Sequence, residues 1–147
     1  MDISLSLLEA GNDIHARALA RLATEEVAWL GTIGRDGYPH AVPIWFVVHD
    51  DRLLVLSEPA TAKVRNLREN PHAFLHLEAG ENGDHLTVLQ GTATLSDRPT
   101  VQWLDEIGER YAEKYAEGLV RQELTLESMA TRYSTVIEFE AVKLIAW

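Results

Sequence analysis

The sequence predicts an α+β domain or a small barrel, made mainly of antiparallel strands with a few covering helices. In six segments the apolar residues alternate with polar ones or form short continuous runs, as they do in strands. The first three of these segments follow one another directly, which indicates an antiparallel meander. No internal repeat and no shift in composition divides the chain, so one domain over residues 1–147 is expected. The six strands are predicted at residues 27–33, 38–49, 53–57, 72–78, 85–95 and 133–145.

The first predicted helix covers residues 13–26 and precedes the sheet. Ile14, Leu19 and Leu22 lie near helical spacing among small and charged residues, and Asp13 is placed to cap the helix. We expect this helix to cover the sheet.

The meander that follows is indicated by its turns. Asp36-Gly37 between two apolar runs is a strong hairpin signal, and Asp50-Asp51 turns the second strand into the third. The second strand contains Pro39 and Pro43, which lack the N–H that a sheet needs. This strand must therefore be an edge, bulged or interrupted near Pro43.

The second half of the chain alternates strands and helices. A short helix over residues 61–70 ends at Asn70-Pro71, because the residue before proline is disfavoured in a helix. In the long strand that follows, Gly91 predicts a bulge or a close backbone approach. A helix is expected over residues 97–117, with Ser96 or Asp97 as its cap and Pro99 in its first turn. A shorter helix is expected over residues 123–131. The apolar face of the longer helix is predicted to consist of Val101, Leu104, Ile107, Tyr111 and Tyr115.

Composition excludes several classes of function. A formal net charge of −10 argues against general nucleic-acid binding and against an anionic membrane surface. The absence of cysteine excludes disulfides, thiolate metal sites and cysteine nucleophiles. No apolar run approaches the roughly 20 residues of a membrane helix, and the N-terminal segment is acidic, unlike a signal peptide. A cytoplasmic protein is therefore expected.

Common catalytic motifs are also missing from the sequence. His72 and His76 share a strand face, but no third ligand has diagnostic spacing, so no metal site is predicted. The sequence has neither the Gly-x-Ser-x-Gly elbow nor the glycine-rich loops of Rossmann and P-loop proteins. Hydrolytic chemistry and these nucleotide sites are unsupported.

The segment Arg52–Pro71 offers a different site. It reads as a buried strand, a polar turn with Ser57 and Thr61, and a short helix with three cations in an acidic chain. Unpaired amides and the dipole at a helix N-terminus favour an anion, so the segment can seat a phosphate. An ordinary surface helix with a cationic side is the alternative that the residues themselves leave open.

Three segments resemble a known family: WLGTIGRDGYPHAVPIWFV (29–47), TAKVRNLRENP (61–71) and VLQGTATL (88–95). Their residues and their order along the chain resemble the motifs of the split β-barrel flavin and deazaflavin oxidoreductases, the small relatives of pyridoxamine 5'-phosphate oxidase. The resemblance covers residues 28–95 and continues more weakly to the C-terminal strand. It implies a six-stranded antiparallel split β-barrel and a homodimer with cofactor sites at the subunit interface.

The resemblance also implies which residues hold the cofactor. Backbone of the second strand lies against the cofactor ring, and the end of the next strand with the following helix holds the phosphate. The residues in the first group are Val42, Pro43, Ile44 and Trp45. Those in the second group are Leu56, Ser57, Thr61, Lys63, Arg65 and Asn66.

The cofactor that the resemblance favours is the deazaflavin coenzyme F-420, with FMN as the alternative. F-420 carries an anionic tail beyond its phosphate, which Arg65 and Arg68 would suit. The expected reaction is hydride transfer between the cofactor and a small conjugated organic substrate, with Trp45, Trp103 and Trp147 as candidate pocket aromatics. No catalytic residue is assigned; Tyr38 and His40 are guesses for a proton donor. The C-terminus, AVKLIAW, lacks the arginine-rich segment that would hold a vitamin B6 phosphate.

Two alternatives belong to other classes. A non-catalytic carrier would bind flavin or haem in the same barrel, and an interaction module would keep the fold without a cofactor.

Overall fold

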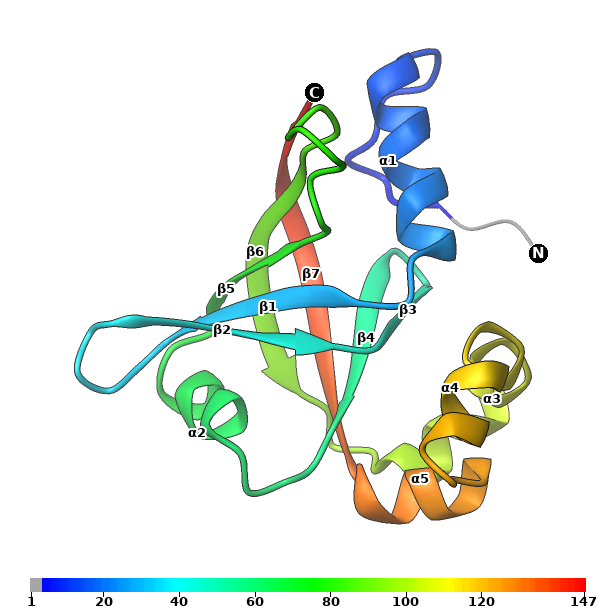
Figure 1. Cartoon of the computed structure of the whole chain (residues 1–147). Coiled ribbons are helices and arrows are strands. Elements are labelled where there is room, and N and C mark those ends of the chain that lie inside the picture. The colour runs from blue at the N-terminus through cyan, green and yellow to red at the C-terminus, as the bar shows by residue number, and fades with distance from the viewer. Residues whose placement is uncertain (1–3) are drawn as a thin grey trace.

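A curled antiparallel sheet with helices at its margins forms the fold, as Figure 1 shows in a computed structural model that describes residues 4–147. The first three residues of the predicted domain lie outside this range. The strands are β1 (Ala28–Ile33), β2 (Pro39–Ile44), β3 (Phe46–His49), β4 (Arg52–Ser57), β5 (His72–His76), β6 (Thr87–Leu95) and β7 (Thr135–Ala146). The helices are α1 (Asp13–Thr24), α2 (Ala62–Glu69), α3 (Thr100–Lys114), α4 (Ala116–Arg121) and α5 (Leu126–Arg132).

The strands pair in the order β2-β1-β5-β6-β7-β4-β3, and every pairing is antiparallel. β2 and β3 are consecutive in the chain but lie at the two ends of this order. The segment that contains them therefore crosses from one edge of the sheet to the other and curls it into a half-open barrel. The predicted class, an antiparallel split barrel with covering helices, is confirmed.

The number of strands differs from the prediction because the second predicted strand is two. It is interrupted at Trp45, where the chain leaves β1 and turns to pair with β4 as β3. Pro43 lies in β2, which pairs with β1 alone, so an edge strand accommodates the missing donor. The described residues thus form seven strands where six were expected.

Gly91 lies at the predicted irregularity. The pairing of β6 with β7 shifts register between Gln90 and Gly91, as a bulge does. A Cβ atom at Gly91 would overlap the carbonyl oxygen of Glu140, so the close backbone approach is also confirmed.

The helix boundaries correct three predictions. Asn12, rather than Asp13, caps α1, and its side chain accepts hydrogen bonds from the amides of Ile14 and His15. The predicted helix over residues 97–117 begins only at Thr100, with Pro99 as its N-cap, and is interrupted at Tyr115 before α4. The helix predicted over residues 123–131 begins at Leu126.

The buried face of α3 also differs from the prediction at one end. Val101 is 63% exposed, whereas Trp103 is buried. Trp103, Ile107 and Tyr111 recur every four residues and so form the face that packs against the sheet.

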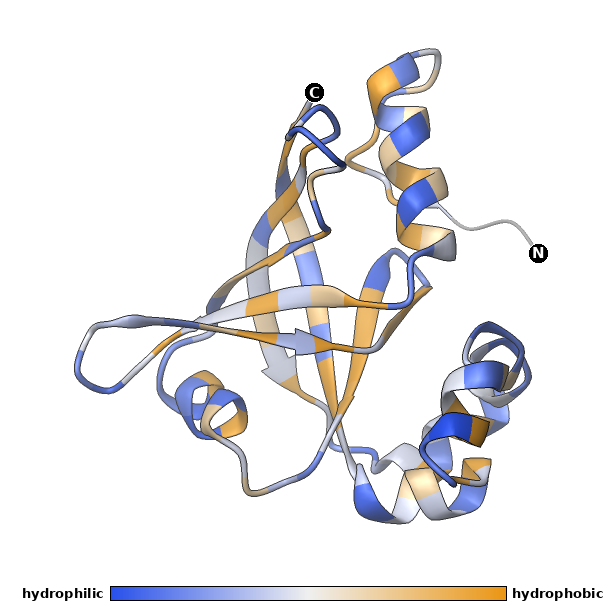
Figure 2. Ribbon diagram, in the orientation of Figure 1, coloured by the Kyte–Doolittle hydropathy of each residue, from blue (hydrophilic) through white to orange (hydrophobic). Residues whose placement is uncertain are grey.

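Hydrophobic side chains pack on both faces of β4. Leu53 and Val55 belong to the cluster inside the barrel, while Leu54 and Leu56 belong to the cluster beneath α3–α5. Both faces are buried because successive side chains of a strand point to opposite sides. Figure 2 shows the hydrophobic colour of β4 beyond its hydrophilic first residue, in contrast to the polar β1–β2 loop. Within residues 4–147, no helix has the length and apolar character needed to cross a membrane.

Candidate functional site

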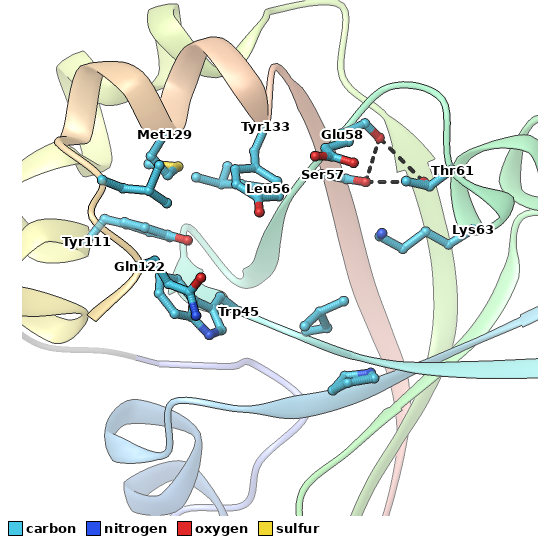
Figure 3. A pocket seen from close by; sticks show the side chains of 13 residues that line it. Trp45, Leu56, Ser57, Glu58, Thr61, Lys63, Tyr111, Gln122, Met129 and Tyr133 are labelled. Carbon is cyan, nitrogen blue, oxygen red and sulfur yellow. Dashed lines mark hydrogen bonds between the residues drawn. The ribbon is translucent and has the colours of Figure 1, made fainter. Parts of the chain in front are cut away.

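A pocket of about 270 Å³ lies where β4 ends, between α2 and the α3–α5 group (Figure 3). Its floor comes from the β2–β3 interruption, one end from the start of α2, and the other end from α3–α5. The lining residues are Pro43, Ile44, Trp45, Leu56, Ser57, Glu58, Thr61, Lys63, Tyr111, Gln122, Leu124, Met129 and Tyr133.

The polar end of the pocket is built by the turn from β4 into α2. Ser57 is buried, and its hydroxyl donates to the carbonyl oxygen of Glu58 at 2.8 Å. Thr61 is the N-cap of α2, but its side chain makes no capping hydrogen bond and lies 3.4 Å from the Ser57 hydroxyl. The amides of the first helical turn are therefore left without a side-chain partner, and they can bind an anion.

Lys63 adds a cation to this end. Its ammonium group is half-buried, and burial lowers its pKa, an effect that nearby Glu58 partly offsets. No ion pair of Lys63 exists within the described part of the chain, 4–147. A half-buried and unpaired ammonium is a group that an incoming anion would stabilise.

Tyr115 holds the floor of the pocket in place. Its hydroxyl accepts from the amide of Phe46 at 2.8 Å and donates to the carbonyl oxygen of Glu26 at 2.7 Å. Its ring stacks on Trp45, with 4.4 Å between the ring centroids and 6° between the planes. A Cβ atom at Gly118 would lie 2.7 Å from the Trp45 ring, so a side chain there would displace the indole.

Lys114 supports the same strand beside Tyr115. Its ammonium donates to the carbonyl oxygen of Phe46 at 2.8 Å and lies 3.8 Å from the centre of the Phe46 ring. Burial lowers the pKa of Lys114 to about 8, and Glu26 and Glu25 partly oppose that shift. The end of α3 therefore fixes the backbone that immediately follows the interruption.

The opposite end of the pocket is aromatic and uncharged. Figure 3 shows the side chains of Tyr111, Gln122 and Tyr133 converging there, beside Met129. Sequence reasoning missed all of these as site residues. Tyr111 was assigned only to the apolar face of its helix, and nothing in its spacing separates a pocket residue from a core residue.

Seven of the ten predicted cofactor residues lie together in this pocket. They are Pro43, Ile44, Trp45, Leu56, Ser57, Thr61 and Lys63.

The other three predicted residues do not line it. Val42 is 38% exposed, and Arg65 is exposed with a long 3.4 Å hydrogen bond to the Ala60 carbonyl. Asn66 donates to the Thr32 hydroxyl at 3.0 Å. The cofactor-binding roles of all ten residues stay predictions.

Other residues singled out in the sequence lie elsewhere. Tyr38 and His40 are exposed near the β1–β2 turn and do not line the pocket. Trp103 donates to the Ser96 hydroxyl, and Trp147 donates to the Gly83 carbonyl. Of the three tryptophans considered for the pocket, Trp45 alone lines it.

One cluster among residues 4–147 has metal-ligating groups: His49, Asp50 and Glu106, whose ligand atoms lie within 4.8 Å of one another. Arg110 lies 2.6 Å from Nδ1 of His49. A guanidinium only donates, so Nδ1 must accept and Nε2 carries the proton towards Glu106 at 3.1 Å. The imidazole is thus saturated by hydrogen bonds, and Glu106 is also paired with Arg98. We assign no metal role to this cluster.

Together, these features define a split-barrel protein with a pocket at the end of β4. Solved structures share this fold. A conserved hypothetical protein of Mycobacterium tuberculosis has a TM-score of 0.71 at 20% identity, over 98% of this chain and 89% of its own. An F420 reductase has a TM-score of 0.64 at 17% identity, over 86% and 94%. A putative pyridoxamine 5'-phosphate oxidase of Listeria innocua has a TM-score of 0.63 at 22% identity, over 89% and 95%.

The family is identified by the sequence itself. The model of the pyridoxamine 5'-phosphate oxidase family matches residues 14–147, so the chain belongs to that family. No curated protein matches the sequence. The family and its split-barrel neighbours include oxidoreductases.

Proposed function

We propose that this protein is an oxidoreductase that binds coenzyme F-420 and transfers a hydride between it and a small conjugated organic substrate. The observation that carries the proposal is Lys63, which is half-buried and unpaired among residues 4–147 beside Ser57 and the start of α2. FMN is the alternative cofactor.

The polar end of the pocket suits a phosphate. Lys63 supplies charge, the Ser57 and Thr61 hydroxyls supply hydrogen-bonding groups, and the first turn of α2 supplies amides. A phosphate bound there would also compensate the burial that lowers the pKa of Lys63.

The charge on α2 supports F-420 over FMN. α2 contains Lys63, Arg65, Arg68 and Glu69, so three cations and one carboxylate give +2, whereas the whole chain has −10. Arg65 and Arg68 are exposed next to the polar end of the pocket. An anionic tail that extends beyond the phosphate would meet these cations, whereas FMN has no such tail.

The floor of the pocket suits a planar ring. Pro43 has no N–H, and Trp45 pairs with neither β1 nor β4, so the Trp45 backbone has no pairing partner among residues 4–147 and is available to a ligand. The bound cofactor would supply the redox chemistry. The residues of this chain would bind the cofactor, orient it and exclude water.

A second copy of the chain is part of the proposal. The pocket of about 270 Å³ is below the roughly 300–1,000 Å³ of complete ligand sites. The outer sheet face has a further hollow of about 400 Å³, lined by Ile33, Phe74 and Val142 among others, and Val142 is 70% exposed. A homodimer that covers this face would bury an apolar patch and complete the site.

Fluorescence titration with F-420 and with FMN tests the cofactor. We expect micromolar binding of F-420, and a roughly ten- to 150-fold loss in Lys63→Ala, because a charged hydrogen bond contributes about 1.5–3 kcal/mol. Lys143→Ala is the matched control, since Lys143 is an exposed lysine outside the pocket. Equal affinities of the two variants would refute the phosphate role of Lys63.

The rival functions give different results in the same titration. Tighter binding of FMN would select the alternative cofactor. Binding of neither cofactor would favour an interaction module, and tight haem binding without hydride transfer would favour a carrier.

A further inference from the structure

Two hydroxyls of the pocket lining, those of Tyr111 and Tyr133, make no hydrogen bond with residues 4–147, and Tyr111 is the more deeply buried residue. Tyr111 is 1% exposed and lines the pocket, yet its hydroxyl makes no hydrogen bond with residues 4–147. Tyr115 follows four residues later, and its hydroxyl is hydrogen-bonded to the amide of Phe46 and to the carbonyl oxygen of Glu26. The hydroxyl is the part of this buried side chain that reaches the pocket, since Arg110 Nε is the buried side-chain polar atom without a partner among residues 4–147, so the hydroxyl is available to a ligand.

The surroundings of this hydroxyl define what it can bind. Figure 3 shows Tyr111 and Lys63 on opposite sides of the pocket, with the Tyr111 hydroxyl directed inward towards Gln122 and Tyr133. The lining residues at this end are uncharged, which suits a neutral group better than an ionic one. A neutral hydrogen-bond acceptor is therefore favoured over an anion or a cation.

The shape and chemistry of this end favour a flat apolar ligand. The Trp45 ring is held rigidly by its stack on Tyr115, and Met129 lies beside Tyr111 in the same end of the pocket. Burial raises the pKa of the Tyr111 phenol, with Tyr133 as a second cause, so the group stays protonated and acts as a donor.

We propose that the Tyr111 hydroxyl donates a hydrogen bond to the carbonyl oxygen of a planar conjugated substrate bound beside Trp45. This inference rests on the proposed oxidoreductase function and names the substrate class for the same site. Tyr111 is thereby a substrate-binding residue, in place of the exposed Tyr38 and His40.

The test uses 4-(4-dimethylaminophenyl)-3-buten-2-one, a flat conjugated ketone whose visible band moves to longer wavelength when its carbonyl accepts a hydrogen bond. We compare the full-length wild type with Tyr111→Phe, and with Tyr38→Phe as the control that removes an exposed phenol. The wild type and Tyr38→Phe should show the longer-wavelength band. Tyr111→Phe should show a shorter-wavelength band and roughly three- to tenfold weaker binding of the ketone.

The outcomes separate this inference from the proposed function. Identical bands in the wild type and Tyr111→Phe, or no binding of the ketone by the wild type, would overturn the inference. Weaker F-420 binding by Tyr111→Phe with an unchanged ketone band would assign the hydroxyl to the cofactor and also overturn it. The wild-type F-420 titration tests the proposed function separately, since the ketone band is read without cofactor.

A structural role for the hydroxyl predicts something else. If Tyr111 served the fold, Tyr111→Phe would lower the melting temperature of the ligand-free protein. We expect no decrease, because the hydroxyl that is removed has no partner within residues 4–147.

Discussion

Tyr115→Phe should destabilise the protein because it removes one hydroxyl that satisfies backbone groups on two segments. The hydroxyl accepts from the Phe46 amide at 2.8 Å and donates to the Glu26 carbonyl at 2.7 Å. The Phe46 carbonyl keeps its hydrogen bond from Lys114, but the Phe46 amide loses its partner. Phe46 is fully buried, so water does not replace the lost bond.

The size of the expected loss in stability follows from the Phe46 amide, which is left without an acceptor. A buried group left unsatisfied costs about 1–3 kcal/mol, so the free energy of unfolding should fall by that amount. The assay is urea unfolding at pH 7, followed by circular dichroism, with the slope of the free energy against urea checked for constancy.

Tyr111→Phe is the matched control, because it removes a phenolic hydroxyl from α3, four residues before Tyr115, where no protein partner exists among residues 4–147. Its unfolding free energy should stay within about 0.5 kcal/mol of the wild type. Equal losses in the two variants, or no loss in Tyr115→Phe, would refute the account of how the pocket floor is held.

The remaining predictions concern the same floor. Gly118→Ala should weaken F-420 binding in the fluorescence titration, because the added Cβ would lie 2.7 Å from the Trp45 ring and displace it; unchanged affinity would show that the Trp45 position is not needed. Burial lowers the pKa of Lys114 from 10.5 to about 8 in the folded state. The unfolded chain therefore binds more protons between pH 8 and 10.5, and stability rises with pH across that window. Relative to Lys114→Met, the wild type should gain roughly 1–3 kcal/mol in unfolding free energy between pH 7.5 and 10, and parallel pH profiles would contradict the assignment.

The parts of the site that are local in sequence were predictable. Ser57, Thr61 and Lys63 lie within seven residues, so a strand, a turn and a helix start place them together whatever the rest of the chain does. Gly91 was predictable for a similar reason, since a glycine inside a strand pattern has few structural explanations.

An irregularity near Pro43 was predictable, but the exact position of the break at Trp45 was not. Pro43 indicated that the strand is irregular, but the site of the break depends on Tyr115, which supplies a hydrogen bond to Phe46 from 69 residues away. Because the break divides the second predicted strand into β2 and β3, the described residues form seven strands and not six.

The aromatic end of the pocket was hidden for a different reason. Tyr111 and Met129 are buried residues on helices that pack on the sheet, and their types and spacing are those of a core. Only the arrangement of α3–α5 around the end of β4 leaves part of that face open as a pocket. The sequence also did not show which residue caps α1, because Asn12 and Asp13 are adjacent and have similar capping preferences.

The central claim is that Lys63, Ser57 and the start of α2 seat the cofactor phosphate. The most direct measurement compares the binding of F-420 with that of its deazaflavin core without the phosphate and tail, in the wild type and in Lys63→Ala. The wild type should prefer F-420 by at least about tenfold, and Lys63→Ala should lose most of that preference. An equal preference in both proteins would place the phosphate elsewhere and contradict the account.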